Sequence, residues 1–168
     1  FTMDPLFHAG AYYVQEASSM AVEQVFRQYM KEVESPVVLD LCASPGGKTT
    51  HLASLLDGEG FLLSNEVVKT RTKTLCENVA KWGFANTAVC SVMPSSFTDL
   101  TGLFDLILVD APCSGEGMFR KDEVAVAEWS RDNVKMCAER QRTILKDVFP
   151  ALKEDGILIY STCTFNPP

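Results

Sequence analysis

Short, continuous apolar segments alternate with amphipathic segments along most of this chain. The clearest of them is "LILV" at 106–109, where hydrophobic residues follow one another directly instead of occupying every second position. A strand with that pattern is buried on both faces, as in a parallel sheet that is covered by helices. Right-handed crossovers between such strands produce a doubly wound fold. The alternation therefore predicts an α/β protein with a largely parallel sheet.

The same patterns place five strands and four helices. Strands are predicted at 36–44, 60–67, 87–92, 104–111 and 156–160, and helices at 17–33, 48–56, 68–82 and 131–152. Pro36 closes the first helix, Gly83 ends the third, and Pro150 is expected to kink or shorten the last. We expect the strand order 3-2-1-4-5, with ligands at the carboxyl ends of the strands.

Composition limits the function. The net charge of −7 argues against a surface that binds nucleic acid over its whole extent, although "KTRTK" at 69–73 could form a local basic patch. No apolar run is long enough for a membrane span and the start has no signal-peptide pattern, so we expect a cytoplasmic protein. The six cysteines form no CxxC pair and the chain has two histidines, so no metal site is predicted. Cys76, Cys90 and Cys137 are interpreted as small buried hydrophobic residues.

A glycine-rich loop, "CASPGGKTT" at 42–50, follows the first strand. Its end resembles a phosphate-binding loop, but that loop needs a glycine at the position that Cys42 occupies, so a nucleotide hydrolase is the weaker interpretation. Gly46 and Gly47 allow close approach of a ligand, and the next helix offers N–H groups to a carboxylate. Glu66, after the second strand, can accept both hydroxyls of a ribose. These features favour S-adenosylmethionine over NAD, whose pyrophosphate needs a GxGxxG spacing.

Four motifs, in order, resemble those of a known family: "DLCASPGGKTT", "SNEV", "DAPCSGEGMFRKD" and "YSTCTFNP", preceded by "GAYYVQEASSM". The chain resembles the NSUN/Sun family of RNA cytosine-5 methyltransferases over about residues 9–167, and the last two motifs resemble its bacterial RsmF-like branch. The resemblance implies a class I methyltransferase fold of the Rossmann-like type, without the last two strands usual in the family. It implies S-adenosylmethionine as cofactor and RNA, ribosomal RNA or a ribosomal subunit, as partner. Residues 1–36 are then an N-terminal segment with a leading helix, and residues 37–168 the methyltransferase core.

Two cysteines suit this chemistry. Carbon 5 of cytosine becomes nucleophilic enough to accept a methyl group only after a thiolate has added to carbon 6. The resemblance implies that Cys163 attacks and that Cys113 assists release, with Lys48 and Asp110 at the target base and the cofactor edge. The implied cofactor-binding residues are Cys42, Ala43, Ser44, Pro45, Gly46, Gly47, Lys48, Glu66 and Asp110. The family usually has an acidic residue near the adenine, where this chain has Met93.

Two alternatives remain open at this point. The chain could be a module that binds S-adenosylmethionine or assists ribosome assembly without catalysing a reaction. Less favoured is a nucleotide hydrolase with a P-loop-like segment.

Overall fold

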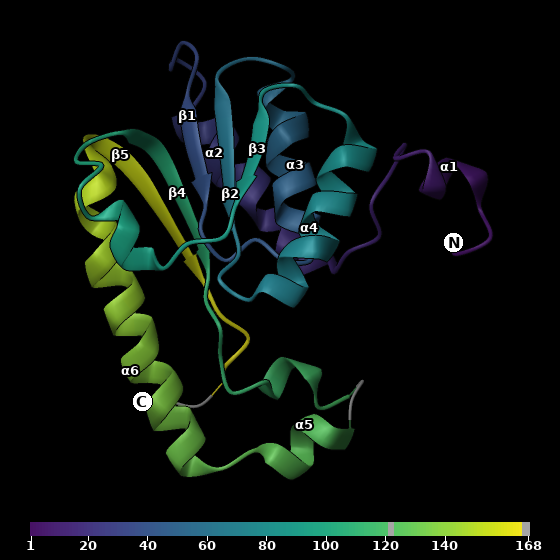
Figure 1. The fold of residues 1–168 in the computed structure, drawn as a ribbon, viewed down its shortest axis with the longest axis vertical. Coiled ribbons are helices and arrows are strands. Elements are labelled where there is room, and N and C mark those ends of the chain that lie inside the picture. The colour runs from purple at the N-terminus through teal and green to yellow at the C-terminus, as the bar shows by residue number, and fades with distance from the viewer. Residues whose placement is uncertain (121–122, 166–168) are drawn as a thin grey trace.

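The computed structural model describes residues 1–120 and 123–165, and its strands form one parallel sheet (Figure 1). The strands are β1 (Val37–Asp40), β2 (Phe61–Asn65), β3 (Thr87–Cys90), β4 (Phe104–Asp110) and β5 (Leu152–Ser161). They lie in the order β3-β2-β1-β4-β5, and every neighbouring pair is parallel. The predicted sheet and its strand order are confirmed.

Helices cover both faces of this sheet. On one face α2 (Ala21–Tyr29) and α3 (Gly47–Leu56) pack against the strands, with α4 (Lys69–Trp82) beside α3; α6 (Arg131–Val148) covers the other face (Figure 1). None of the helices among the described residues is long and apolar enough to cross a membrane.

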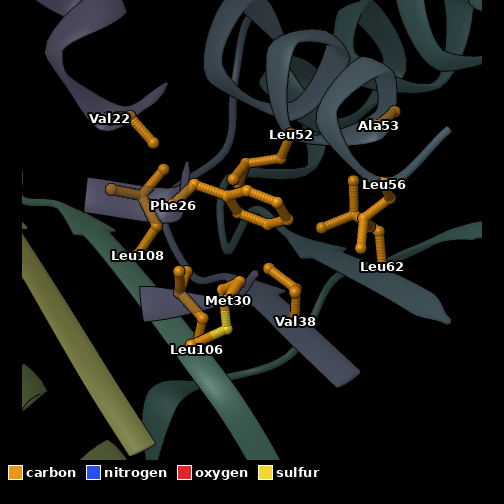
Figure 2. Packing of buried hydrophobic residues seen from close by; sticks show 10 residues of the cluster. All are labelled: Val22, Phe26, Met30, Val38, Leu52, Ala53, Leu56, Leu62, Leu106 and Leu108. Carbon is orange, nitrogen blue, oxygen red and sulfur yellow. The ribbon is translucent and has the colours of Figure 1, made fainter. Parts of the chain in front are cut away.

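Successive residues of β4 explain why its sequence is continuously apolar. Leu106 and Leu108 join the core under α2 and α3, whereas Ile107 and Val109 join the core under α6. All four are fully buried, because side chains alternate between the two faces of a strand and both faces are covered. Figure 2 shows the first of these cores, formed by Val22, Phe26, Met30, Val38, Leu52, Ala53, Leu56, Leu62, Leu106 and Leu108.

Several predicted boundaries were wrong. The leading helix begins as a 3-10 turn (Ala17–Met20) and ends at Tyr29, because the chain must turn before Pro36, and Ser35 adopts a left-handed conformation with φ 50°. The last helix ends at Val148 instead of residue 152, and Pro150 lies in the 3-10 turn Phe149–Ala151 that follows. Pro150 was expected to kink or shorten this helix, and the helix is indeed shorter than predicted.

Leu152, which we predicted as the last residue of that helix, instead starts β5 opposite Phe104. A register shift follows between Phe104 and Leu106, so the ladder resumes with Leu106 opposite Ile157. Leu152 and Ser161 extend the predicted strand by pairing with Phe104 and Asp110 of β4, a long-range contact that the local pattern does not reveal.

Four short helical segments were not predicted: α1 (Pro5–His8), the 3-10 turns Pro94–Phe97 and Glu116–Met118, and α5 (Glu123–Glu128). Helix α5 lies beyond the carboxyl ends of the strands (Figure 1). The three cysteines interpreted as buried differ from one another. Cys137 is buried, Cys90 is half-buried, and Cys76 is exposed on α4, so that interpretation was wrong for Cys76.

Candidate active site

A cavity of about 240 Å³ opens at the carboxyl ends of β1 and β4. Its walls include every predicted cofactor-binding residue except Gly46 and Glu66, and Asp40 also lines it. The N-terminal segment supplies Tyr13, Val14, Gln15 and Ser19 to the same cavity. The structure therefore brings residues from three distant parts of the sequence together at the end of the sheet where a doubly wound fold binds its ligands.

The glycine-rich loop is held from two sides. Gly46 has φ 115°, a conformation that favours glycine. A Cβ atom on Gly47 would lie 2.9 Å from Cε1 of Tyr13 and 3.0 Å from Oε1 of Gln15, so the N-terminal segment lies directly against the loop. A side chain at position 47 would therefore force Tyr13 or Gln15 to move.

Helix α4 braces the other side of the loop. The guanidinium of Arg71 donates a 2.9 Å hydrogen bond to the carbonyl of Ser44, whose hydroxyl donates a 3.0 Å bond to the carbonyl of Arg71. The Asn78 amide donates a 2.8 Å bond to the carbonyl of Pro45. The exposed "KTRTK" segment thus contributes one of its basic side chains to loop structure.

Glu66 lies at the end of β2 and is buried, with 5% of its surface exposed. Its Oε1 accepts a 2.9 Å hydrogen bond from the N–H of Val68, and its Oε2 lies 3.6 Å from Nη2 of Arg71. Asn65, which the sequence analysis did not single out, ties together the ends of three strands. Its amide donates to the carbonyl of Leu41 at 3.1 Å and its Oδ1 accepts from the N–H of Val92 at 3.0 Å.

Lys48 and Asp110 form an ion pair with an Nζ to Oδ2 distance of 2.7 Å. The other oxygen of Asp110 accepts a 2.7 Å hydrogen bond from the hydroxyl of Ser161, the last residue of β5. The pair thus links the first turn of α3 with the ends of β4 and β5. The structure thus brings together the two residues that the resemblance assigns to the target base and the cofactor edge.

The two predicted catalytic cysteines lie side by side, on the loops that follow β4 and β5. Burial acts to raise the pKa of Cys113, but hydrogen bonds from the Cys163 thiol and from the backbone of Gly115 and Cys163 hold that pKa below its usual value. Burial, followed by the hydrogen bond and the negative charge of Cys113, raises the pKa of Cys163 to about 11. The pair therefore loses its first proton readily and retains the second.

Asp40 is a site residue that the sequence analysis missed. It is fully buried, its Oδ2 accepts a 2.7 Å hydrogen bond from Thr49, and its Oδ1 has no partner among the described residues. Burial is the largest cause that raises the pKa of Asp40, to about 7, and the negative charges of Asp110 and Glu66 act in the same direction. The available signal was an acidic residue inside the apolar run "VVLDL".

The remaining residues singled out by the sequence analysis include Cys42 and Met93. Burial raises the pKa of the Cys42 thiol to about 12, so it stays protonated in the cavity wall. Met93 and the basic residue Arg120 are exposed, and the next residue, Lys121, lies outside the described residues. Within residues 1–120 and 123–165, no three histidine, cysteine or acidic side chains group as a metal site would require.

Comparison with known proteins extends these observations. A family model described as "16S rRNA methyltransferase RsmB/F" matches residues 27–168. The chain is 42% identical over 159 residues to ribosomal RNA small subunit methyltransferase F of Vibrio cholerae, and 42% identical over 158 residues to the protein of that name in Psychromonas ingrahamii. Each alignment covers 94% of this chain and 33% of the relative, so the chain spans about a third of the length of these relatives.

Solved structures agree with the family match. NSun6 from Pyrococcus horikoshii, solved with SFG, superposes with a TM-score of 0.82 at 30% identity and covers 99% of this chain and 41% of its own. A methyltransferase homologue from the same organism gives 0.81 at 32% identity, over 99% of this chain and 51% of its own. Coclaurine N-methyltransferase, at 15% identity and a TM-score of 0.54, shares the fold alone. The sheet and the match over most of the sequence show that this chain has the Rossmann-like methyltransferase fold and belongs to the RsmB/F family of 16S rRNA methyltransferases.

Proposed function

We propose that this protein transfers a methyl group from S-adenosylmethionine to carbon 5 of a cytosine in RNA, with ribosomal RNA as the substrate. The observation that carries the proposal is the pair of contacting thiols, Cys113 and Cys163, beside the Lys48–Asp110 ion pair in a chain of this family. In this proposal residues 37–168 carry the chemistry and residues 1–36 cover the cavity. The protein acts in the cytoplasm, where its RNA is found.

The cavity residues fit S-adenosylmethionine, which supplies the methyl group when bound. Glu66, which follows β2 and lies outside the cavity wall, would hold the ribose hydroxyls. The first turn of α3 would face the carboxylate, and the unpartnered Oδ1 of Asp40 would give the cavity wall an acceptor for a positively charged group. The related NSun6 protein was solved with SFG, an analogue of this cofactor, which supports the assignment.

Four side chains have separate roles in the reaction of the cytosine base. Cys163 forms the bond to carbon 6, and Cys113, whose thiolate form is favoured, accepts the Cys163 proton through the hydrogen bond between them. Asp110 contacts ring nitrogen 3 and the amino group, and Lys48 favours the anionic forms of the base and the thiol. Once carbon 5 carries the methyl group, its proton passes to water, its electrons restore the double bond between carbons 5 and 6, and the bond from Cys163 to carbon 6 breaks. Cys113 assists this release by returning the proton it accepted to the departing Cys163 sulfur.

Substitution of each cysteine tests the division of roles, in a protein of the length of its relatives. With Cys163→Ala we expect neither methylated RNA nor a protein–RNA adduct, because the bond to carbon 6 cannot form. With Cys113→Ala the pKa of Cys163 is no longer raised by the hydrogen bond and negative charge of Cys113, so attack continues. We therefore expect an adduct that accumulates and survives denaturing electrophoresis, because release is slow. The double variant should lose that adduct.

Cys76→Ala is the matched control, since Cys76 is an exposed thiol on α4 and should have wild-type activity. An adduct that forms with Cys163→Ala and disappears with Cys113→Ala would reverse the assigned roles. Full activity in both single variants would exclude the covalent mechanism.

A further inference from the structure

Glu116 is a buried carboxylate next to both active-site loops. It begins the 3-10 turn at Glu116–Met118, three residues after Cys113, and only 7% of its surface is exposed. A carboxylate taken out of water is stable only where hydrogen-bond donors replace the water. The hydrogen-bond donors around Glu116 therefore indicate which segments its carboxylate holds in place.

Donors from three separate segments converge on this carboxylate. Oε2 accepts a 2.6 Å hydrogen bond from the backbone N–H of Phe165, two residues after Cys163. Oε1 accepts a 2.9 Å bond from the indole N–H of Trp129 and a 3.2 Å bond from the hydroxyl of Ser114. The loop after β4, the loop after β5 and the connection from α5 to α6 are thus joined at one side chain.

Further contacts show how closely the two cysteine loops fit. The N–H of Gly117 donates a 3.0 Å hydrogen bond to the carbonyl of Cys163, and the hydroxyls of Ser114 and Thr164 lie 3.1 Å apart. A Cβ atom on Gly117 would lie 2.7 Å from the Cβ of Cys163 and 3.3 Å from its sulfur. The Cys163 side chain therefore lies directly against the turn that Glu116 begins.

We infer that Glu116 is a positioning residue that holds the Cys113 and Cys163 loops together, so that the two thiols stay in contact. Its catalytic consequence rests on the function proposed above, in which a proton passes between these thiols. The pairing of β4 with β5 ends at Asp110 and Ser161, so beyond it the two loops are joined by individual hydrogen bonds such as the one from Gly117 to Cys163. Glu116 adds the bonds to its carboxylate, and charge-assisted bonds to a carboxylate are roughly twice as strong as neutral ones.

Glu116→Gln keeps the size of the side chain but removes one of its two acceptor oxygens. The new amide group would face either the N–H of Phe165 or the donors from Trp129 and Ser114, so at least one donor loses its partner. Glu128→Gln is the matched control, because Glu128 is an exposed glutamate at the end of α5, next to Trp129. Trp129→Phe removes a single hydrogen bond and serves as the milder variant.

The first measurement follows alkylation of each cysteine by iodoacetamide across pH, read by mass spectrometry, in a protein of the length of its relatives. In wild-type protein Cys113 should become reactive at a lower pH than an isolated thiol, whose pKa is about 8.5. In Glu116→Gln its midpoint should rise, because the thiolate loses its hydrogen bond from Cys163 while burial still disfavours the charged form. Trp129→Phe should shift the midpoint less, and Glu128→Gln not at all.

The second measurement is methyl transfer to RNA. Because a displacement of about 1 Å can cost on the order of 100-fold in rate, Glu116→Gln should lower kcat by about that factor and change KM by less than about twofold. An unchanged alkylation midpoint in folded Glu116→Gln would overturn the inference, as would a loss of thermal stability with unchanged kcat. If wild-type protein does not methylate RNA but the midpoint still shifts, the proposed function fails and the positioning role stands.

Discussion

At the scale of single residues, Asp40 has the most unusual environment in the described chain. It is the only acidic residue there that is fully buried, and one of its oxygens has no partner among the described residues. Burial raises its pKa to about 7, whereas an aspartate in an unfolded chain has a pKa of about 3.9. The folded state therefore binds a proton more tightly than the unfolded state, and stability must depend on pH.

The direction of this dependence follows from the raised pKa. Between about pH 4 and pH 7 the folded protein holds more protons than the unfolded chain, so stability falls as pH rises through this window and the loss is complete above about pH 7. Asp40→Asn removes this loss. Between pH 5 and pH 8 we expect wild-type protein without cofactor to lose about 3 kcal/mol more unfolding free energy than Asp40→Asn in urea titrations.

Asp57→Asn serves as the control, since Asp57 is exposed at the end of α3 and should follow the wild-type pH dependence. Parallel pH profiles for wild-type and Asp40→Asn would show that Asp40 is ionised in the folded protein at all of these pH values.

At the scale of elements, α6 closes one face of the sheet and leads from the active-site loops to β5. Its start was predicted correctly after Ser130, whose hydroxyl accepts a 3.1 Å hydrogen bond from the N–H of Asn133. Such a cap satisfies one of the free N–H groups of the first helical turn. Ile144 and Val148 then bury the helix against β1 and β4.

Loss of the cap should weaken the helix without affecting the cavity. Ser130→Ala should lower the free energy of unfolding by about 1 kcal/mol, since an unsatisfied donor remains at the helix start. For a chain of this size the melting temperature should fall by about 2–4 °C, measured by circular dichroism. Ser96→Ala, at an exposed serine of a 3-10 turn, is the control. Equal melting temperatures for the two variants would mean that the cap contributes nothing measurable.

At the scale of the whole molecule, cofactor binding should stabilise the fold, because the cavity joins the N-terminal segment, the glycine-rich loop and β4. At a concentration 100 times its Kd, S-adenosylmethionine should stabilise the protein by about 2.7 kcal/mol, which raises the melting temperature by roughly 5–10 °C. Glu66→Ala should bind it about tenfold more weakly or worse, because a charge-assisted hydrogen bond is lost, and should show a smaller rise.

ATP with magnesium is the comparison ligand and should leave the melting temperature unchanged. A rise with ATP and none with S-adenosylmethionine would favour the nucleotide hydrolase that the glycine-rich loop first suggested. Equal rises for wild-type and Glu66→Ala would remove Glu66 from the cofactor site.

The parallel sheet, its strand order and the motifs at the strand ends could be predicted from the amino-acid sequence. Those features depend on local patterns. Strand β4 is apolar at every position from Leu106 to Val109, Ser130 marks the start of α6, and Gly83 marks the end of α4. The sequence also singled out Lys48 and Asp110, whose motifs lie far apart in the chain but at one end of the sheet.

Which side chains come into contact, and which are removed from water, depends on the packing of the folded chain. Three features depend on segments that are distant in the sequence. They are the burial of Asp40, the contact of Tyr13 and Gln15 with the glycine-rich loop, and the hydrogen bonds that Trp129 and Phe165 donate to Glu116. The pKa of a carboxyl and the contact of two thiols depend on neighbours in space, through desolvation and hydrogen bonds. A linear pattern names such residues as acids and thiols, but only the packed chain sets their chemistry.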